Sequence, residues 1–142
     1  MNENFRKHGD APYDIAVIHG GPGAPGEMKP VAERLSSDHG VLEPFQTASS
    51  IEEQVDELRD VLLQYGDLPL SLVGYSWGAW LSYIFAAIHP DLVEKAILVG
   101  SPPFQAKYAA GITETRLKRL EDEERAEAEN LLKKTSQSLD VD

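Results

Sequence analysis

The residues with the clearest chemical potential form the stretch Gly74-Tyr75-Ser76-Trp77-Gly78, which reads Gly-x-Ser-x-Gly. An apolar run at residues 70–73 precedes it, and a longer apolar run follows from Trp77 onward. A serine on a sharp turn from strand to helix presents its hydroxyl at the top of a sheet, where it can act as a nucleophile. Strand and helix crowd such a turn, so the residues two before and two after the serine must be small, and here they are Gly74 and Gly78.

A second glycine-rich stretch could hold negative charge beside that serine. The helix that begins after Ser76 directs free backbone N–H groups toward its own start, and the N–H of Trp77 is the first candidate donor to an oxyanion. The stretch His19-Gly20-Gly21-Pro22-Gly23 follows an apolar run of its own. A glycine there lets the backbone approach a reacting carbonyl, and the proline stiffens the turn, so we assign the second donor to the N–H of Gly21. The two stretches together predict descent from a serine hydrolase.

Strands and helices are predicted to alternate along the chain. Short apolar runs predict strands at residues 15–18, 41–45, 70–75 and 96–99, and Pro44 places the second of these at a sheet edge or a bulge. Apolar residues at helical spacing predict helices at residues 27–37, 51–65 and 77–89. Ser50 and Glu53 form a capping box for the second helix, and the third is apolar all round and therefore expected to be buried.

This order of elements indicates the α/β class, with a mostly parallel sheet and helices on both of its faces. Continuously apolar strands that are separated by helices are typical of that class. Active sites in such sheets lie beyond the carboxyl ends of the strands. Both glycine-rich stretches fall at those ends.

Composition excludes several classes of function. The 142 residues suffice for one domain with a core, and 24 acidic against 13 basic residues give a net charge of −11, which disfavours nucleic acid and anionic membrane as partners. There is no cysteine, and we find no metal-ligand spacing, dinucleotide motif or P-loop, so we expect no cofactor and no metal. Residues 1–10 are polar and no apolar run approaches the length of about 20 residues that a membrane span needs, so we expect a cytoplasmic protein.

The two glycine-rich stretches resemble the two signatures of the α/β-hydrolase superfamily. The combination of His-Gly-Gly-Pro-Gly with Ser-Trp-Gly is most similar to the prolyl-aminopeptidase-like branch, and the similarity runs from about residue 15 to residue 103. The resemblance implies that Ser76 is the nucleophile and that the N–H groups of Gly21 and Trp77 form the oxyanion hole. It also implies a hydrolase core at residues 1–112. Residues 113–142, with a charged surface helix predicted at 114–134, would then begin a cap or lid.

The chain departs from the pattern of this family in its triad. The family order is Ser, then Asp or Glu, then His, yet no strand is predicted after residue 99, and the family's first two strands are short or missing. His89 is thirteen residues after Ser76 in the same predicted helix, about 20 Å away at 1.5 Å per residue, and so cannot serve as the base. We expect His19 to hold its loop together, and His8 and His39 to be surface residues.

Two hypotheses follow. In the first, the chain is the N-terminal portion of a serine hydrolase that cleaves an ester or amide bond of a small substrate through an acyl-enzyme, with the acid and histidine of the triad absent from this chain. In the second, it is a non-catalytic binding or scaffold domain that has kept the sheet and lost the triad. Under the first hypothesis, residues 96–99 form an apolar, unprotected sheet edge, which predicts a homodimer or an aggregate through that edge.

Overall fold

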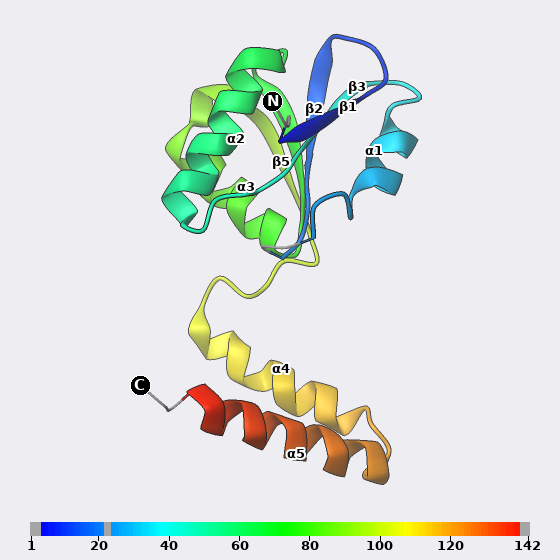
Figure 1. Cartoon of the computed structure of the whole chain (residues 1–142), viewed down its shortest axis with the longest axis vertical. Coiled ribbons are helices and arrows are strands. Elements are labelled where there is room, and N and C mark those ends of the chain that lie inside the picture. Colours follow the sequence, from blue (N-terminus) through cyan, green and yellow to red (C-terminus); the bar gives the residue numbers. More distant parts are fainter. Residues whose placement is uncertain (1–3, 22–23, 140–142) are drawn as a thin grey trace. The chain divides into compact units, whose positions relative to one another are not determined.

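The structure of the chain, a computed structural model, describes residues 4–21 and 24–139 (Figure 1). The chain divides into two compact units, Met1–Pro102 and Pro103–Asp142. In the first unit, the described residues form a sheet of five strands in the order β1-β3-β2-β4-β5. The strands are β1 (Phe5–His8), β2 (Tyr13–Ile18), β3 (Gly40–Pro44), β4 (Leu70–Tyr75) and β5 (Val93–Val99). β1 runs antiparallel to β3, and the other neighbouring pairs are parallel.

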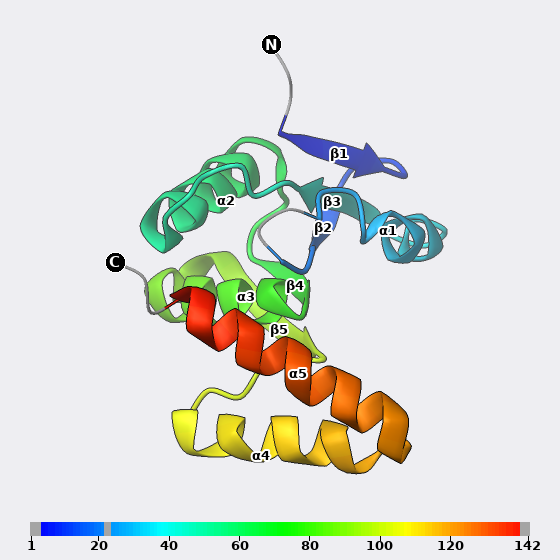
Figure 2. The ribbon, with the colours of Figure 1, turned by 60° about the horizontal axis from the view of Figure 1, so that its bottom comes forward.

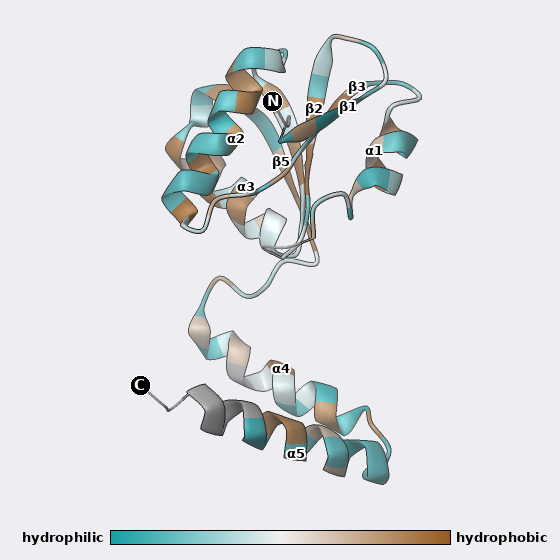
Figure 3. Cartoon of the chain, viewed as in Figure 1, coloured by the Kyte–Doolittle hydropathy of each residue, from teal (hydrophilic) through white to brown (hydrophobic). Residues whose placement is uncertain are grey.

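Helices cover both faces of this sheet. They are α1 (Lys29–Leu35), α2 (Ile51–Tyr65) and α3 (Trp77–Ile88), and a 3-10 helix (Pro90–Leu92) leads into β5. Successive residues of a strand point to opposite faces. Ile15 and Val17 of β2 therefore pack on the α1 side, whereas Ala16 and Ile18 pack on the side of α2 and α3. Figures 1 and 2 show these layers, and Figure 3 shows the apolar residues along the central strands. The predicted α/β class, with a mostly parallel sheet between helices, is confirmed.

The ends of α1 and α2 follow from local sequence signals. The Ser50 hydroxyl oxygen accepts the N–H of Glu53 at 3.2 Å, as the predicted cap of α2 requires. The helix predicted at residues 27–37 is shorter, because residues 25–28 form a turn in which Gly26 has a φ of +88°, a conformation that disfavours any residue with a side chain. Pro30 then lies in the first turn of α1, where no backbone N–H is needed.

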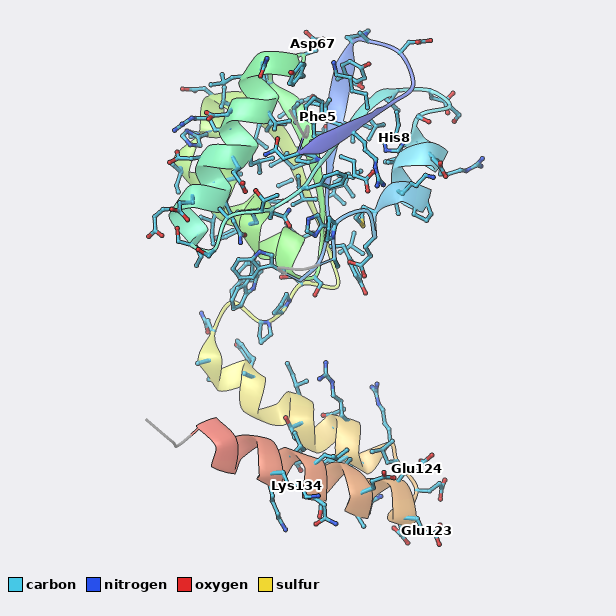
Figure 4. The ribbon with its side chains drawn as sticks, in the orientation of Figure 1. Phe5, His8, Asp67, Glu123, Glu124 and Lys134 are labelled. Carbon is cyan, nitrogen blue, oxygen red and sulfur yellow. The ribbon has the colours of Figure 1, made fainter. Side chains whose placement is uncertain are left out.

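The structure contains a strand, β1, that the sequence analysis missed. Phe5 points to the α2 side, where its ring centroid lies 4.5 Å from that of Tyr65, and His8 points to the α1 side (Figure 4). His8 Nε2 lies 2.9 Å from Oε2 of Glu43, which is fully buried, so the expectation of a surface residue was wrong for His8. A strand of four residues, of which three are polar or charged, leaves too little periodicity to be recognised in the sequence.

β3 is an inner strand, although Pro44 had predicted an edge or a bulge. β1 pairs along one side of β3 and β2 along the other. Pro44 is the last residue of β3, so its missing N–H interrupts no ladder inside the strand. The N–H of Phe45 donates to the carbonyl oxygen of Asn4 at 2.7 Å and continues the contact with the β1 side. The prediction failed because the rule for proline concerns residues within a ladder, not at its end.

α3 is buried on one side only, although its sequence predicted burial all round. Leu81 and Phe85 are fully buried against the sheet, whereas Tyr83 and Ile88 are 53% and 57% exposed. The described elements of the first unit therefore leave an apolar strip of this helix uncovered. No helix in residues 4–21 and 24–139 combines the length and the apolar character that crossing a membrane requires.

The second unit contains two helices among its described residues, α4 (Ala106–Lys118) and α5 (Asp122–Leu139), where a single helix was predicted at 114–134. The Arg125 guanidinium donates to the carbonyl oxygens of Leu117 and Leu120 at 3.0 and 2.9 Å, which satisfies the end of α4. Acidic residues, among them Glu123 and Glu124 (Figure 4), favour a new helix start at α5. The expected boundary between residues 112 and 113 lies inside α4, and the second compact unit begins at Pro103.

The homodimer that was expected to form through the outer edge of β5 stays a prediction, and the structure leaves that edge accessible among the described strands. No strand in the described part of the chain pairs there, and Ile97 and Val99 are 49% and 45% exposed. Two copies of β5 related by a twofold axis can pair antiparallel about Ala96, which sets Lys95 of each copy opposite Ile97 of the other. In this register no like charges face one another, and all seven residues of the strand are paired.

We therefore expect a dimer whose population rises with concentration in sedimentation velocity experiments. Ile97→Lys would set lysine opposite Lys95 twice and is expected to weaken association roughly tenfold, since like charges directly opposite destabilise a sheet. The matched variant Ile97→Glu sets opposite charges there and should associate as well as the wild type. A chain that stays monomeric at high concentration would contradict the prediction.

Candidate active site

Ser76 is the single residue between the end of β4 and the start of α3. Its φ of 53° and ψ of −116° lie in a region that residues with a side chain rarely adopt. Such a conformation costs about 1–3 kcal/mol and persists only where the surroundings enforce it. Here the N–H of Ser76 donates to the carbonyl oxygen of Val99 in β5 at 2.9 Å. The half-buried serine therefore lies on a strained turn from strand to helix, at the carboxyl end of the sheet.

Gly74 and Gly78 allow the helix to cross directly over the strands. A Cβ atom on Gly74 would overlap the carbonyl oxygen of Gly78 and lie 2.5 Å from the hydroxyl oxygen of Ser82. A Cβ atom on Gly78 would overlap the carbonyl oxygen of Ile18 and lie 2.5 Å from that of His19. Real Cβ atoms do not approach other atoms this closely, so only glycine fits at either position.

The loop that follows β2 touches the turn at Ser76. β2 and β4 are parallel neighbours in which Ile18 is paired with Gly74, so the loops after the two strands meet at one edge. A Cβ atom on Gly20 would lie 3.1 Å from Cβ of Ser76. The next residue, Gly21, has a φ of +52°, and a Cβ atom there would meet nothing within 4 Å.

Two backbone N–H groups at this edge, those of Gly21 and Trp77, have no partner among the described residues. Gly20 N–H donates to Oε2 of Glu27 at 3.1 Å and is thereby occupied. Gly21 N–H has no acceptor within residues 4–21 and 24–139. Trp77 N–H belongs to the first turn of α3, where amides lack a partner within the helix. Pro22 and Gly23 of the predicted loop lie outside the described residues.

A buried glutamine on α2 anchors the side chain of Trp77. The indole N–H of Trp77 donates to Oε1 of Gln54 at 2.9 Å, and Nε2 of Gln54 donates to the carbonyl oxygen of Ala48 at the same distance. Gln54 is 4% exposed, so both of its polar groups need these partners. The sequence analysis missed this residue, although a polar side chain between Ile51 and Leu58 on the apolar face of a helix is a usable signal.

His19 holds its loop together through both ring nitrogens. The ring is fully buried, with Nδ1 3.0 Å from the carbonyl oxygen of Gly20, and Nε2 accepts the N–H of Gln46 at 3.2 Å. These contacts assign the proton to Nδ1 and use the lone pair of Nε2. His19 therefore has no free nitrogen with which to take a proton from Ser76.

The other histidines lie away from the serine. His8 pairs in register with Val41, and His39 directly precedes β3, so both lie at the amino end of that strand. His39 is exposed, as expected, with Nδ1 2.9 Å from Oδ2 of Asp14. His89 caps the carboxyl end of α3. The hydroxyl of Ser76 has no hydrogen-bond partner among the described residues.

Two further polar groups were not predicted. Glu27 binds the loop through Gly20, and nothing in the sequence pattern signals this contact. The side-chain oxygen and nitrogen of Gln46 are buried without a partner in the part of the chain that the structure describes. Within the same residues, no group of three histidine or acidic side chains is arranged to hold a metal ion.

The crowding at Gly78 leads to a stability prediction. We expect Gly78→Ala to lower the free energy of unfolding of the first unit by at least about 2 kcal/mol, because the added methyl group overlaps two carbonyl oxygens. Thermal unfolding followed by fluorescence of Trp77 and Trp80 measures this change. Gly111→Ala, in α4 where the new Cβ atom meets nothing within 4 Å, should leave that transition unchanged. Equal stability of the Gly78→Ala variant and the wild type would contradict the close crossing.

Comparison with known proteins gives two curated relatives. A pimeloyl-[acyl-carrier protein] methyl ester esterase from Chromobacterium violaceum is 32% identical over 108 residues, which cover 72% of this chain and 42% of that protein. Epoxide hydrolase 3 from Mus musculus is 33% identical over 54 residues, which cover 38% of this chain and 15% of that protein. The chain thus spans less than half the length of either relative.

Solved structures and a family profile agree on the fold. The crystal structure of Bacillus megaterium epoxide hydrolase in complex with an inhibitor has a TM-score of 0.64 and 20% identity, covering 82% of this chain and 48% of that one. At this identity the likeness concerns the fold alone. The sequence profile of the alpha/beta hydrolase fold matches residues 22–139, which is most of the chain. A strained serine turn at the carboxyl end of a mostly parallel sheet accompanies this match, and the chain belongs to the alpha/beta hydrolase fold family.

Proposed function

We propose that this chain carries the nucleophile and the oxyanion hole of a serine hydrolase, which cleaves an ester or amide bond of a small substrate. The observation that carries the proposal is Ser76, whose φ of 53° is held between β4 and α3 with its hydroxyl free of partners among the described residues. Strain of this kind clusters at functional sites. The relatives support hydrolysis, since their names describe a methyl ester esterase and an epoxide hydrolase. On its loop motifs, we assign the chain to the prolyl-aminopeptidase-like branch.

The proposed reaction runs through an acyl-enzyme. Ser76 Oγ attacks the carbonyl carbon of the substrate and gives its proton to a base, and the N–H groups of Gly21 and Trp77 bind the oxyanion that forms. The tetrahedral intermediate then expels the alcohol or amine, which takes the proton, and leaves the acyl group on Ser76. Attack by water on the same carbonyl releases the acid and restores the serine.

The proposal assigns the base and its orienting acid to residues outside this chain. His19 uses both ring nitrogens within its own loop, and His89 caps the far end of α3. An unassisted serine hydroxyl is a weak nucleophile. The 142 residues alone are therefore expected to react slowly. The same observation favours the alternative function, a non-catalytic binding or scaffold domain in which the serine turn is only a remnant.

Labelling with a fluorophosphonate separates the two functions. We expect slow modification of the 142-residue chain at Ser76, detected as a mass increase of the intact protein and located by peptide mapping. Ser76→Ala should abolish it, whereas the matched variant Ser101→Ala, in the loop after β5, should be modified at the wild-type rate. No modification of Ser76 after prolonged exposure would favour the scaffold. Rapid modification would mean that this chain contains a base after all.

A further inference from the structure

The carboxylate of Glu27 closes the loop that joins β2 to α1. Its Oε2 accepts the N–H of Gly20 at 3.1 Å, across a separation of seven residues. A Cβ atom on Gly20 would lie 3.0 Å from this oxygen and 3.1 Å from Cβ of Ser76. Oε2 of Glu27 and Cβ of Ser76 therefore both lie beside Gly20, and the distance between them is no greater than the sum of these two distances. No other part of the mechanism uses this carboxylate.

Gly20 is held through both of its peptide groups. On one side its N–H donates to Glu27, and on the other its carbonyl oxygen accepts Nδ1–H of His19 at 3.0 Å. In a planar trans peptide, the C=O of one residue and the N–H of the next point in opposite directions. The contact from His19 thus sets the direction of the Gly21 N–H, provided that Gly20 itself does not rotate. A glycine is the residue least able to resist such rotation on its own.

We infer that Glu27 is a positioning residue, which pins Gly20 so that the N–H of Gly21 stays directed at the oxyanion. This inference rests on the proposed function of Ser76 and Gly21. It requires of Glu27 only a hydrogen-bond acceptor and not a negative charge. The charge in fact opposes the negative oxygen that develops nearby in the reaction. A role as general base, or as a binding group for a cationic substrate, would require the charge.

Two substitutions distinguish these roles. Glu27→Gln keeps an acceptor for the Gly20 N–H and removes the charge, so we expect it to react with a fluorophosphonate at least as fast as the wild type. Glu27→Ala removes the acceptor, and we expect roughly tenfold slower modification of Ser76, a fraction of what the loss of a whole oxyanion donor costs. Glu33→Ala serves as the matched control, because Glu33 is an exposed carboxylate in α1 whose partner, Lys29, is 3.4 Å away.

Amide hydrogen exchange measured by NMR supplies a readout that does not depend on reactivity. In Glu27→Ala the Gly20 amide should exchange roughly tenfold faster than in the wild type, since it loses its acceptor, while Glu27→Gln and Glu33→Ala should retain its protection. Unchanged exchange of the Gly20 amide in Glu27→Ala would overturn the inference, and so would unchanged labelling of a reactive Ser76. So would an equal loss of labelling in Glu27→Gln and Glu27→Ala, since it would show that the charge is used.

The proposed function can fail separately from this inference. If the wild-type chain is never modified at Ser76, the proposed function fails, and the exchange of the Gly20 amide still decides whether Glu27 holds the loop. If Ser76 is modified at the same rate in the wild type and in Glu27→Ala, the reactive serine stands and the positioning role of Glu27 falls.

Discussion

The site depends on how closely the start of α3 approaches the carboxyl ends of β2 and β4. At Gly78 the helix backbone lies against the last carbonyl oxygens of the β2 region, and at Gly74 the strand lies against the helix backbone in turn. This crossing leaves a single residue, Ser76, in which to change from strand to helix, and that residue takes a positive φ. The strain is local, about 1–3 kcal/mol, whereas the contacts that enforce it come from three neighbouring parallel strands.

Side chains from outside the turn then organise its surroundings. His19 and Glu27 hold Gly20 from either side, and Gln54 ties the indole of Trp77 to the loop after β3. The contacts of His19 and Glu27 with Gly20 lie within the loop after β2, whereas the contact of Gln54 with Trp77 joins α2 to α3. The polar groups of His19 and Gln54 are stable in their buried places because each has its partner. Hydrogen bonds from side chains thus hold both segments that carry the candidate oxyanion donors, the loop of Gly21 and the start of α3 at Trp77.

The sequence could predict those elements whose signals are local. The apolar runs of β2 and β4, the cap at Ser50 and the glycine spacing around Ser76 all act within a few residues, and the structure agrees with the elements they predicted. β1 could not be predicted, because its place depends on pairing with β3 rather than on its own pattern. The break between α4 and α5 depends on Arg125 reaching back to α4. Similarly, the contact of Glu27 with Gly20 is formed by a turn that no periodicity describes. The catalytic roles at the site stay predictions.

The hydrogen bond from Ser76 to Val99 has a consequence for the serine itself. β5 is one of the two edge strands of the described sheet and most of its residues are exposed, and the edge of a sheet opens more readily than its interior. Each opening of β5 breaks the hydrogen bond between the Ser76 N–H and the carbonyl oxygen of Val99, and the strained φ can then relax. The strained conformation that presents the Ser76 hydroxyl therefore lasts only while β5 stays paired with β4. Any contact that covers the outer edge of β5 would also stabilise the conformation of Ser76.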